Sequence, residues 1–302
     1  MPDYSLHLET RRTSRSALRH WKVIFIICIL LFVGIYLLSS KFPAPSRDMT
    51  KSSPLSQKLE KILRDTSGTY SIYVYDIKKK KEYGVHESTV ITAASINKIP
   101  ILATLYHLAG KGEIDLDKTI TPQPTDIQDY GTGSIRYDPP STPYSLKTLA
   151  RLMMEKSDNT AAHLLGDTII GLDTIQQFVD NWGLTQTDMA ENKTSAKDMS
   201  ILLVKMFNKE ITTPSLTSEM LGFMEKSDYD DRIPVGIPDG TKIYHKTGDE
   251  VGKIHDVGIV NLENSPYYLG ILTTDVTGEE ETRRTISEIS KTVYEAMKAT
   301  GL

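Results

Sequence analysis

The sequence has little cysteine, no strong excess of either charge and no internal repeat. Its single cysteine, Cys28, excludes a disulfide within the chain. The seven histidines are scattered, and no cysteine–histidine cluster has the spacing of zinc ligands. The net charge of −4 gives no electrostatic basis for binding nucleic acid. We therefore expect no metal, no cofactor and no nucleic-acid partner.

One apolar run lies near the start of the chain. Residues 1–22 are polar and basic, whereas residues 23–39 carry no charge. A run of this length just spans the apolar core of a bilayer, and its basic flank would stay in the cytoplasm. We interpret residues 23–39 as a single membrane anchor that leaves the rest of the chain extracytoplasmic, at the cell surface or in the periplasm. A cleaved signal peptide is the alternative, although no small-x-small pattern directly follows Leu38.

The remaining chain reads as a linker and one folded domain. Residues 40–54 are polar and rich in proline, and residues 55–302 alternate between apolar and polar segments. Two strand-like segments precede a helical block and three follow it. This order predicts an α+β fold, in which one antiparallel sheet built from both chain ends is flanked by helices and joined to an all-helical lobe. The expected helices are 55–65, 96–108, 146–155, 160–167, 172–182, 196–208, 218–225 and 279–299, and the expected strands are 69–76, 82–86, 241–247, 254–262 and 266–274, with Gly248 in a turn.

A serine and a lysine lie three residues apart at the start of the expected helix 96–108. Residues three apart share one face of a helix, so the amine of Lys98 would lie beside the hydroxyl of Ser95. Serine is a poor nucleophile until a base within hydrogen-bond distance accepts its proton. Alone, the pair would equally fit a helix-capping serine followed by a solvated lysine.

Two further polar motifs follow in order. Ser157-Asp158-Asn159 lies between two expected helices, and Lys246-Thr247-Gly248 ends an expected strand. Each alone fits a cap or a turn. Together with the first pair, they resemble the three motifs of class A β-lactamases and penicillin-binding proteins. Segments 129–135, 231–234 and 256–260 extend the resemblance, which covers about residues 60–300.

The resemblance implies an acyl-enzyme mechanism. Ser95 would attack the substrate carbonyl, and Lys98 would accept its proton. Burial and the neighbouring charge of Lys246 would depress the pKa of Lys98 and so favour the neutral base. Ser157 would relay the proton to the leaving nitrogen.

The resemblance also implies how the substrate would be held. Asn159 would hydrogen-bond the side-chain amide of the substrate. Thr247 and Lys246 would bind its carboxylate, and Arg232 could extend that carboxylate site. Tyr130 could line the mouth of the cleft, although a packed loop tyrosine fits its position nearly as well.

The same resemblance implies an oxyanion hole made of backbone N–H groups. The donors would be those of Ser95 and Asp249, and Gly248 would let the strand approach the serine.

One part of the pattern is missing. Class A β-lactamases carry a glutamate on a long Ω-shaped loop, four residues before an asparagine, to activate the water that releases the acyl group. The corresponding loop, residues 181–195, is shorter than the Ω-shaped loop of the family, and Glu191 is followed four residues later by Ser195. Glu191 is our tentative candidate for the hydrolytic base, and a surface glutamate is the alternative.

These features predict a membrane-anchored serine hydrolase in which deacylation could be slow. Its substrate would be a β-lactam amide, opened through an acyl-enzyme on Ser95. The alternative is a D-alanyl-D-alanine carboxypeptidase that uses the same residues on peptidoglycan stem peptides. A β-lactam sensor is disfavoured, because the 22 residues before the apolar run are too few for an output domain. We expect a monomer.

Overall fold

The computed structural model describes residues 53–300. The predicted basic tail, the predicted anchor and nearly all of the predicted linker lie outside this range. Among the described residues, no helix is both long and apolar enough to cross a membrane. The anchor and the domain boundaries therefore stay predictions.

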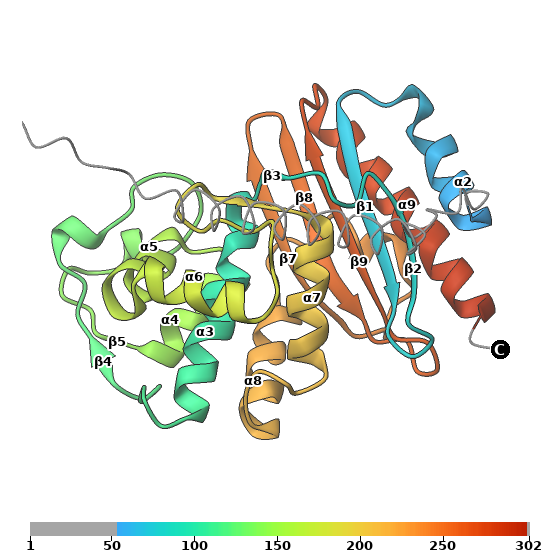
Figure 1. Ribbon diagram of the computed structural model, residues 1–302. Coiled ribbons are helices and arrows are strands. Elements are labelled where there is room, and N and C mark those ends of the chain that lie inside the picture. The colour runs from blue at the N-terminus through green and yellow to red at the C-terminus, as the bar shows by residue number, and fades with distance from the viewer. Residues whose placement is uncertain (1–52, 301–302) are drawn as a thin grey trace, which may run out of the picture. The chain divides into compact units, whose positions relative to one another are not determined.

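A five-stranded antiparallel sheet forms the centre of the domain (Figure 1). Its strand order is β2-β1-β9-β8-β7, so strands from the two ends of the domain pair with each other. This arrangement confirms the predicted sheet. The strands are β1 (Thr69–Asp76), β2 (Lys81–Val85), β7 (Ile243–Glu250), β8 (Lys253–Val260) and β9 (Tyr267–Thr274).

Two helices cover one face of this sheet. They are α2 (Pro54–Ile62), which continues into the 3₁₀ turn η1 (Leu63–Asp65), and α9 (Glu279–Thr300). Leu59 of α2 and Ile286 of α9 pack with Ile72 and Ile271 of the sheet, and all four side chains are fully buried. Burial of apolar surface on this face holds together the first and last helices of the described residues.

The other face of the sheet packs against the helical lobe and its larger core (Figure 1). Strand β9 is buried on both faces, with Tyr268 and Leu272 in this second core, which explains why its sequence is apolar almost throughout. The lobe contains η2 (Ala94–Asn97), α3 (Lys98–Gly110), η3 (Pro124–Asp126), η4 (Ile135–Tyr137), α4 (Leu146–Glu155), α5 (Asn159–His163), η5 (Leu164–Ile170), α6 (Leu172–Asn181), α7 (Ala196–Phe207) and α8 (Pro214–Met224).

Several boundaries differ from those expected. Gly248 lies inside β7, paired with His255, and the turn falls at residues 251–252, where Gly252 has a φ of +71°. Helix α8 starts four residues earlier than predicted, because Thr213 caps it and Pro214 occupies its first turn. The expected helix 160–167 instead divides into α5 and a π-helix, η5.

Short elements also occur where the sequence indicated none. They are β3 (Ile91–Thr92) paired with β6 (Lys193–Thr194), β4 (Thr119–Ile120) paired with β5 (Tyr144–Ser145), and η6 (Pro234–Gly236). Two-residue strands leave too little periodic pattern to detect. The β3–β6 pair matters for function, because it joins the segment before Ser95 to the shortened loop.

Truncating Ile271 tests the central position of β9. Ile271→Ala removes fully buried apolar contacts between β1 and β8, so we expect the free energy of unfolding to fall by about 2–5 kcal/mol. Chemical denaturation measures this change. Val251→Ala, at a side chain that is 94% exposed, should change it by less than about 0.5 kcal/mol. Equal stability of the two variants would contradict this position for β9.

Candidate active site

The three sequence motifs converge on one cavity of about 440 Å³. Its walls come from the η2–α3 junction, the loop 128–132, the turn between α4 and α5, and the end of β7. Ser95, Lys98, Ser157, Asn159 and Thr247 all line it. The structure thus brings together residues more than 150 positions apart in the sequence.

Ser95 and Lys98 face each other across the junction of two helical segments. Ser95 lies in the 3₁₀ turn η2, and Lys98 is the first residue of α3, so the pair does not share one continuous α-helix as predicted. Lys98 Nζ lies 3.0 Å from Ser95 Oγ. Ala94, immediately before the serine, has a φ of +49°, a left-handed conformation that residues other than glycine seldom adopt.

Lys98 has three further oxygen partners. Two of them can only accept hydrogen bonds, and the third, the hydroxyl of Ser157, also contacts Lys246. Lys98 Nζ lies 2.6 Å from the backbone oxygen of Ser157 and 2.7 Å from Asn159 Oδ1. A neutral amine has two hydrogens and one lone pair. Its hydrogens satisfy these two oxygens, and its lone pair can then accept the hydroxyl hydrogen of Ser95. A neutral Lys98 could thus act as the base for Ser95, whereas a protonated Lys98 would donate to Ser95 Oγ.

Two buried lysines flank Ser157. The hydroxyl oxygen of Ser157 lies 3.1 Å from Lys98 Nζ and 3.0 Å from Lys246 Nζ. Burial lowers the pKa of Lys98 well below its ordinary value, and the charge of Lys246 lowers it further, against an opposing effect of Asp158. Burial also lowers the pKa of Lys246, to about 7, although Asp256 partly opposes this shift. Both amines are therefore held closer to neutrality than a solvated lysine.

The turn that carries Ser157 is fixed by hydrogen bonds from both sides. Ser157 itself has a φ of +53°, and its backbone oxygen accepts a 2.8 Å hydrogen bond from Thr132 Oγ1. The Asp158 carboxylate caps α5 through the N–H of Ala161 and also accepts the N–H of Ile135. These contacts join the loop 128–135 to the second motif. Thr132 is a supporting residue that the sequence interpretation missed.

Gly248 brings β7 against the segment that carries the serine. A methyl group at this position would lie 3.0 Å from the backbone oxygen of Ala93, 3.2 Å from Ile96 Cγ1 and 3.3 Å from the backbone nitrogen of Ser95. A larger residue could not be accommodated without a shift of backbone. The role predicted for Gly248 depends on this close approach of the strand to the serine.

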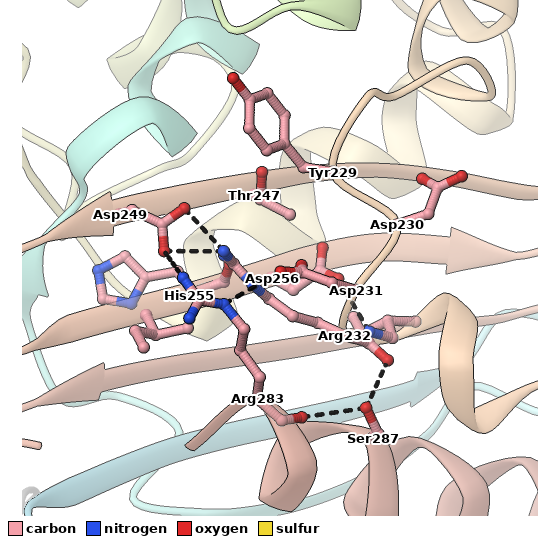
Figure 2. A network of polar contacts seen from close by, with 12 residues as sticks. Tyr229, Asp230, Asp231, Arg232, Thr247, Asp249, His255, Asp256, Arg283 and Ser287 are labelled. Atoms are coloured by element: carbon pink, nitrogen blue, oxygen red, sulfur yellow. Dashed lines mark hydrogen bonds and ion pairs between the residues drawn. The ribbon is translucent and has the colours of Figure 1, made fainter. Parts of the chain in front are cut away.

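Arg232 lies behind the cavity and does not line it. Its guanidinium is 1% exposed and binds both oxygens of Asp249, at 2.7 and 2.8 Å (Figure 2). It also donates a 2.7 Å hydrogen bond to the backbone oxygen of His255. Arg283 of α9 pairs with Asp231 and lies 3.8 Å from Asp249. The structure therefore does not bring the predicted carboxylate ligand Arg232 to the cleft; its charge is engaged by Asp249.

His255 ties the sheet to the strand before Ser95. Its Nδ1 accepts the N–H of Thr273, which leaves a hydrogen on Nε2 to donate to the backbone oxygen of Thr92, each at 3.0 Å. Burial lowers the pKa of His255 to about 4, so the ring is neutral at physiological pH. Thr92 belongs to β3, three residues before the nucleophile.

His245, the residue before the third motif, binds two carboxylates. The buried ring lies between the carboxylates of Asp256, at 2.9 Å, and Asp230, at 3.0 Å. Burial lowers its pKa, but the two carboxylates outweigh that effect and raise it to about 9. A charged imidazole thus sits next to Lys246 along β7.

The two remaining predicted residues differ in position. Tyr130 lines the cavity and is 64% exposed, as a residue at the mouth would be. Glu191 does not line the cavity: its side chain is 66% exposed and its carboxylate lies 3.6 Å from Lys193. The shortened loop instead contributes Met189 and Asn192 to the cavity wall.

Sequence interpretation also missed two titratable residues in the wall, His163 and Asp167. They line the cavity on α5 and η5, with His163 Nδ1 3.3 Å from Asp167 Oδ2. His163 follows Asn159 by four residues, so helical spacing could have placed both on one face. Among residues 53–300, no group of three or more potential metal ligands occurs.

Comparison with known proteins identifies the family. The sequence model described as the β-lactamase enzyme family, Beta-lactamase2, matches residues 54–297. The chain therefore belongs to the β-lactamase enzyme family.

Among its relatives, the β-lactamase VEB-1 of Pseudomonas aeruginosa is 21% identical over 80% of this chain and 89% of its own length. The extended-spectrum β-lactamase PER-1 of the same organism is 22% identical over 83% and 90%. The solved structure of PBP-A is similar with a TM-score of 0.77 and 27% identity, covering 82% of this chain and 97% of PBP-A.

Substitution of Gly248 tests the close approach of β7 to the serine. Gly248→Ala would force the strand and the Ser95 segment apart, so we expect acylation by a β-lactam to slow by about 10²-fold or more. Stopped-flow kinetics with a chromogenic β-lactam measures this rate. Gly222→Ala on α8, where an added methyl group meets nothing within 4 Å, should leave it unchanged. A Gly248→Ala enzyme with normal acylation would contradict the proposed approach.

The buried His255 predicts a loss of stability in mild acid. Its pKa in the folded chain, about 4, lies below the value of about 6.5 for a free imidazole, so the unfolded chain binds more protons between these values. The free energy of unfolding should therefore fall, by a few kcal/mol in order of magnitude, as the pH drops from about 6.5 to about 4. Urea denaturation at several pH values should show a smaller fall for His255→Gln. Parallel curves for the two proteins would contradict the prediction.

Proposed function

We propose that the chain is a serine hydrolase that opens β-lactam amides through an acyl-enzyme on Ser95. The observation that carries this proposal is the position of Lys98. Its amine is buried and lies 3.0 Å from the serine hydroxyl, and the burial lowers its pKa, which favours the neutral base. Membership of the β-lactamase enzyme family supports the substrate class.

Acylation follows from the contacts in the cavity. The lone pair of Lys98 accepts the hydroxyl proton as Ser95 Oγ attacks the carbonyl carbon of the β-lactam. The resulting oxyanion is stabilised by the backbone N–H groups of Ser95 and Asp249. The proton passes through Ser157 Oγ, which touches both lysines, to the ring nitrogen. The C–N bond then breaks, which leaves an ester on Ser95 and a neutral Lys98.

Three residues are proposed to bind the substrate. Thr247 and Lys246 hold its carboxylate at the end of β7, and Asn159 holds its side-chain amide. Asn159 Oδ1 is bound to Lys98, and its Nδ2 donates to the backbone oxygen of Tyr130. Asn159 therefore positions the base as well as the substrate.

Hydrolysis of the ester is proposed to be slower than its formation. Of the residues in loop 181–195 that line the cavity, Met189 and Asn192, neither is acidic, and the Glu191 carboxylate is paired with Lys193. General-base catalysis contributes about 10²–10⁴-fold to such a step. With no acidic residue of this loop in the cavity wall, any base for this step would have to come from another element, and release of the acyl group should limit turnover.

A D-alanyl-D-alanine carboxypeptidase is the second candidate, on the same residues. The shortened loop favours it, because a long-lived penicillin adduct is typical of enzymes whose natural substrate is a peptide. The likeness to PBP-A also supports it: a variant of that protein has been solved as an acyl-enzyme with penicillin G, with 26% identity to this chain.

We further propose that residues 23–39 anchor the enzyme and that it acts outside the cytoplasm as a monomer.

Replacement of the nucleophile tests the assignment. Ser95→Ala should abolish covalent labelling by a fluorescent penicillin, because no ester can form. Ser88→Ala, at an exposed loop position, should label like the unchanged protein. Labelling that persists in Ser95→Ala would show that another residue is the nucleophile.

Two turnover assays on the unchanged enzyme then separate the candidates. Steady hydrolysis of a chromogenic β-lactam supports the first. Release of D-alanine from a stem peptide, with a stable penicillin adduct, supports the second.

A further inference from the structure

A histidine–carboxylate pair lines the cavity on the side of the helical lobe. His163 ends α5, and Asp167 lies one turn further along, in the π-helix η5. The Nδ1 atom of His163 lies 3.3 Å from Asp167 Oδ2. Both side chains belong to the wall of the cavity that contains Ser95. Neither takes part in the acylation steps described above.

The geometry leaves the second ring nitrogen of His163 available. With Nδ1 directed at Asp167, Nε2 has no hydrogen-bond partner among residues 53–300. The side chain is 33% exposed, so water can reach it. A carboxylate 3.3 Å from one ring nitrogen favours a hydrogen on Nδ1, which leaves the lone pair on Nε2.

His163 lies on the same short helix as a residue that contacts the proposed base. It follows Asn159 by four residues, and such residues lie on one face of a helix with Cβ atoms roughly 6 Å apart. Asn159 Oδ1 lies 2.7 Å from Lys98 Nζ, which lies 3.0 Å from Ser95 Oγ. The imidazole is thus one helical turn from the residue that contacts the base, and the cavity between them has room for water.

The other acidic side chains of the wall are engaged elsewhere. Asp249 is bound by Arg232, at 2.7 and 2.8 Å, and Glu250 lies 3.5 Å from Lys253. Both lie at the end of β7, the strand proposed to supply the oxyanion hole. The local backbone around His163 is also unusual, since η5 is a π-helix in which Gly171 N donates to Gly166 O at 2.9 Å. Such insertions are frequent at functional sites.

We infer that His163, oriented by Asp167, is the general base that activates water for hydrolysis of the Ser95 ester. This inference rests on the proposed acyl-enzyme. Nε2 accepts one proton from water as the water oxygen attacks the ester carbon. The tetrahedral intermediate then collapses with cleavage of the bond to Ser95 Oγ, and the proton on His163 moves to that oxygen. The products are the opened acid, the serine hydroxyl and a neutral imidazole.

Separate measurement of the two half-reactions tests this role. Mass spectrometry of the intact enzyme after a pulse of penicillin gives the rate at which the adduct forms and the rate at which it disappears. For His163→Ala we expect formation within about twofold of the unchanged enzyme and disappearance slower by about 10²-fold or more. Asp167→Asn should slow disappearance less, because it removes only the orienting charge.

Two controls separate a base from a structural residue. His163→Gln keeps most of the side-chain volume but has no basic nitrogen. Its rate of acyl-group release should fall as much as that of His163→Ala. Added imidazole should accelerate release in His163→Ala, whereas it cannot restore a lost packing contact. His86→Asn, at an exposed position with a left-handed φ of +52° that asparagine tolerates, should behave like the unchanged enzyme.

The outcomes distinguish the inference from the proposed function. Normal release in His163→Ala or His163→Gln, with normal adduct formation, would overturn the role of His163 and leave the acyl-enzyme intact. Absence of any adduct on the unchanged enzyme would instead overturn the proposed function.

Discussion

The site depends on the burial of two lysines around one serine hydroxyl. An ammonium group removed from water is costly unless it is paired, and here the two amines share Ser157 Oγ as a neighbour instead of separate carboxylates. Burial lowers the pKa of both amines, and the charge of Lys246 lowers the pKa of Lys98 further. Burial that lowers the pKa of Lys98 favours its neutral form, and a basic amine 3.0 Å from Ser95 Oγ can make that serine a nucleophile. The chemistry thus follows from burial.

The fold supplies this burial by joining elements that are distant in sequence. Lys98 begins α3 of the helical lobe, whereas Lys246 lies on β7, the edge strand of the sheet. Gly248 allows these two parts to meet at the Ser95 segment, and His255 fixes the strand that precedes it. Behind β7, the pairing of Arg232 with Asp249 holds the strand end (Figure 2). These contacts therefore fix the positions of the Ser95 segment and of the end of β7, which form two walls of the cavity.

The sequence could predict the sheet and the residues that meet in the cavity, because alternating apolar segments and three ordered motifs are local patterns. It could not predict where isolated side chains point. Arg232 was expected at the substrate carboxylate, but a tertiary contact with Asp249 engages it. Glu191 lies on a turn whose direction depends on the pairing of residues 188 and 193. His163 and Asp167 are four residues apart, so helical spacing could place them on one face, but neither belongs to one of the three motifs, and the sequence did not show that this face borders the cavity.

The titration of Lys98 tests the central claim most directly. Carbon-13 labelling of the lysine side chains allows the pKa of Lys98 to be followed by NMR in the free enzyme. The account predicts a pKa well below that of an ordinary lysine, which rises when Lys246→Met removes the neighbouring charge. A Lys98 that keeps its proton up to the pH at which solvated lysines titrate would contradict the account.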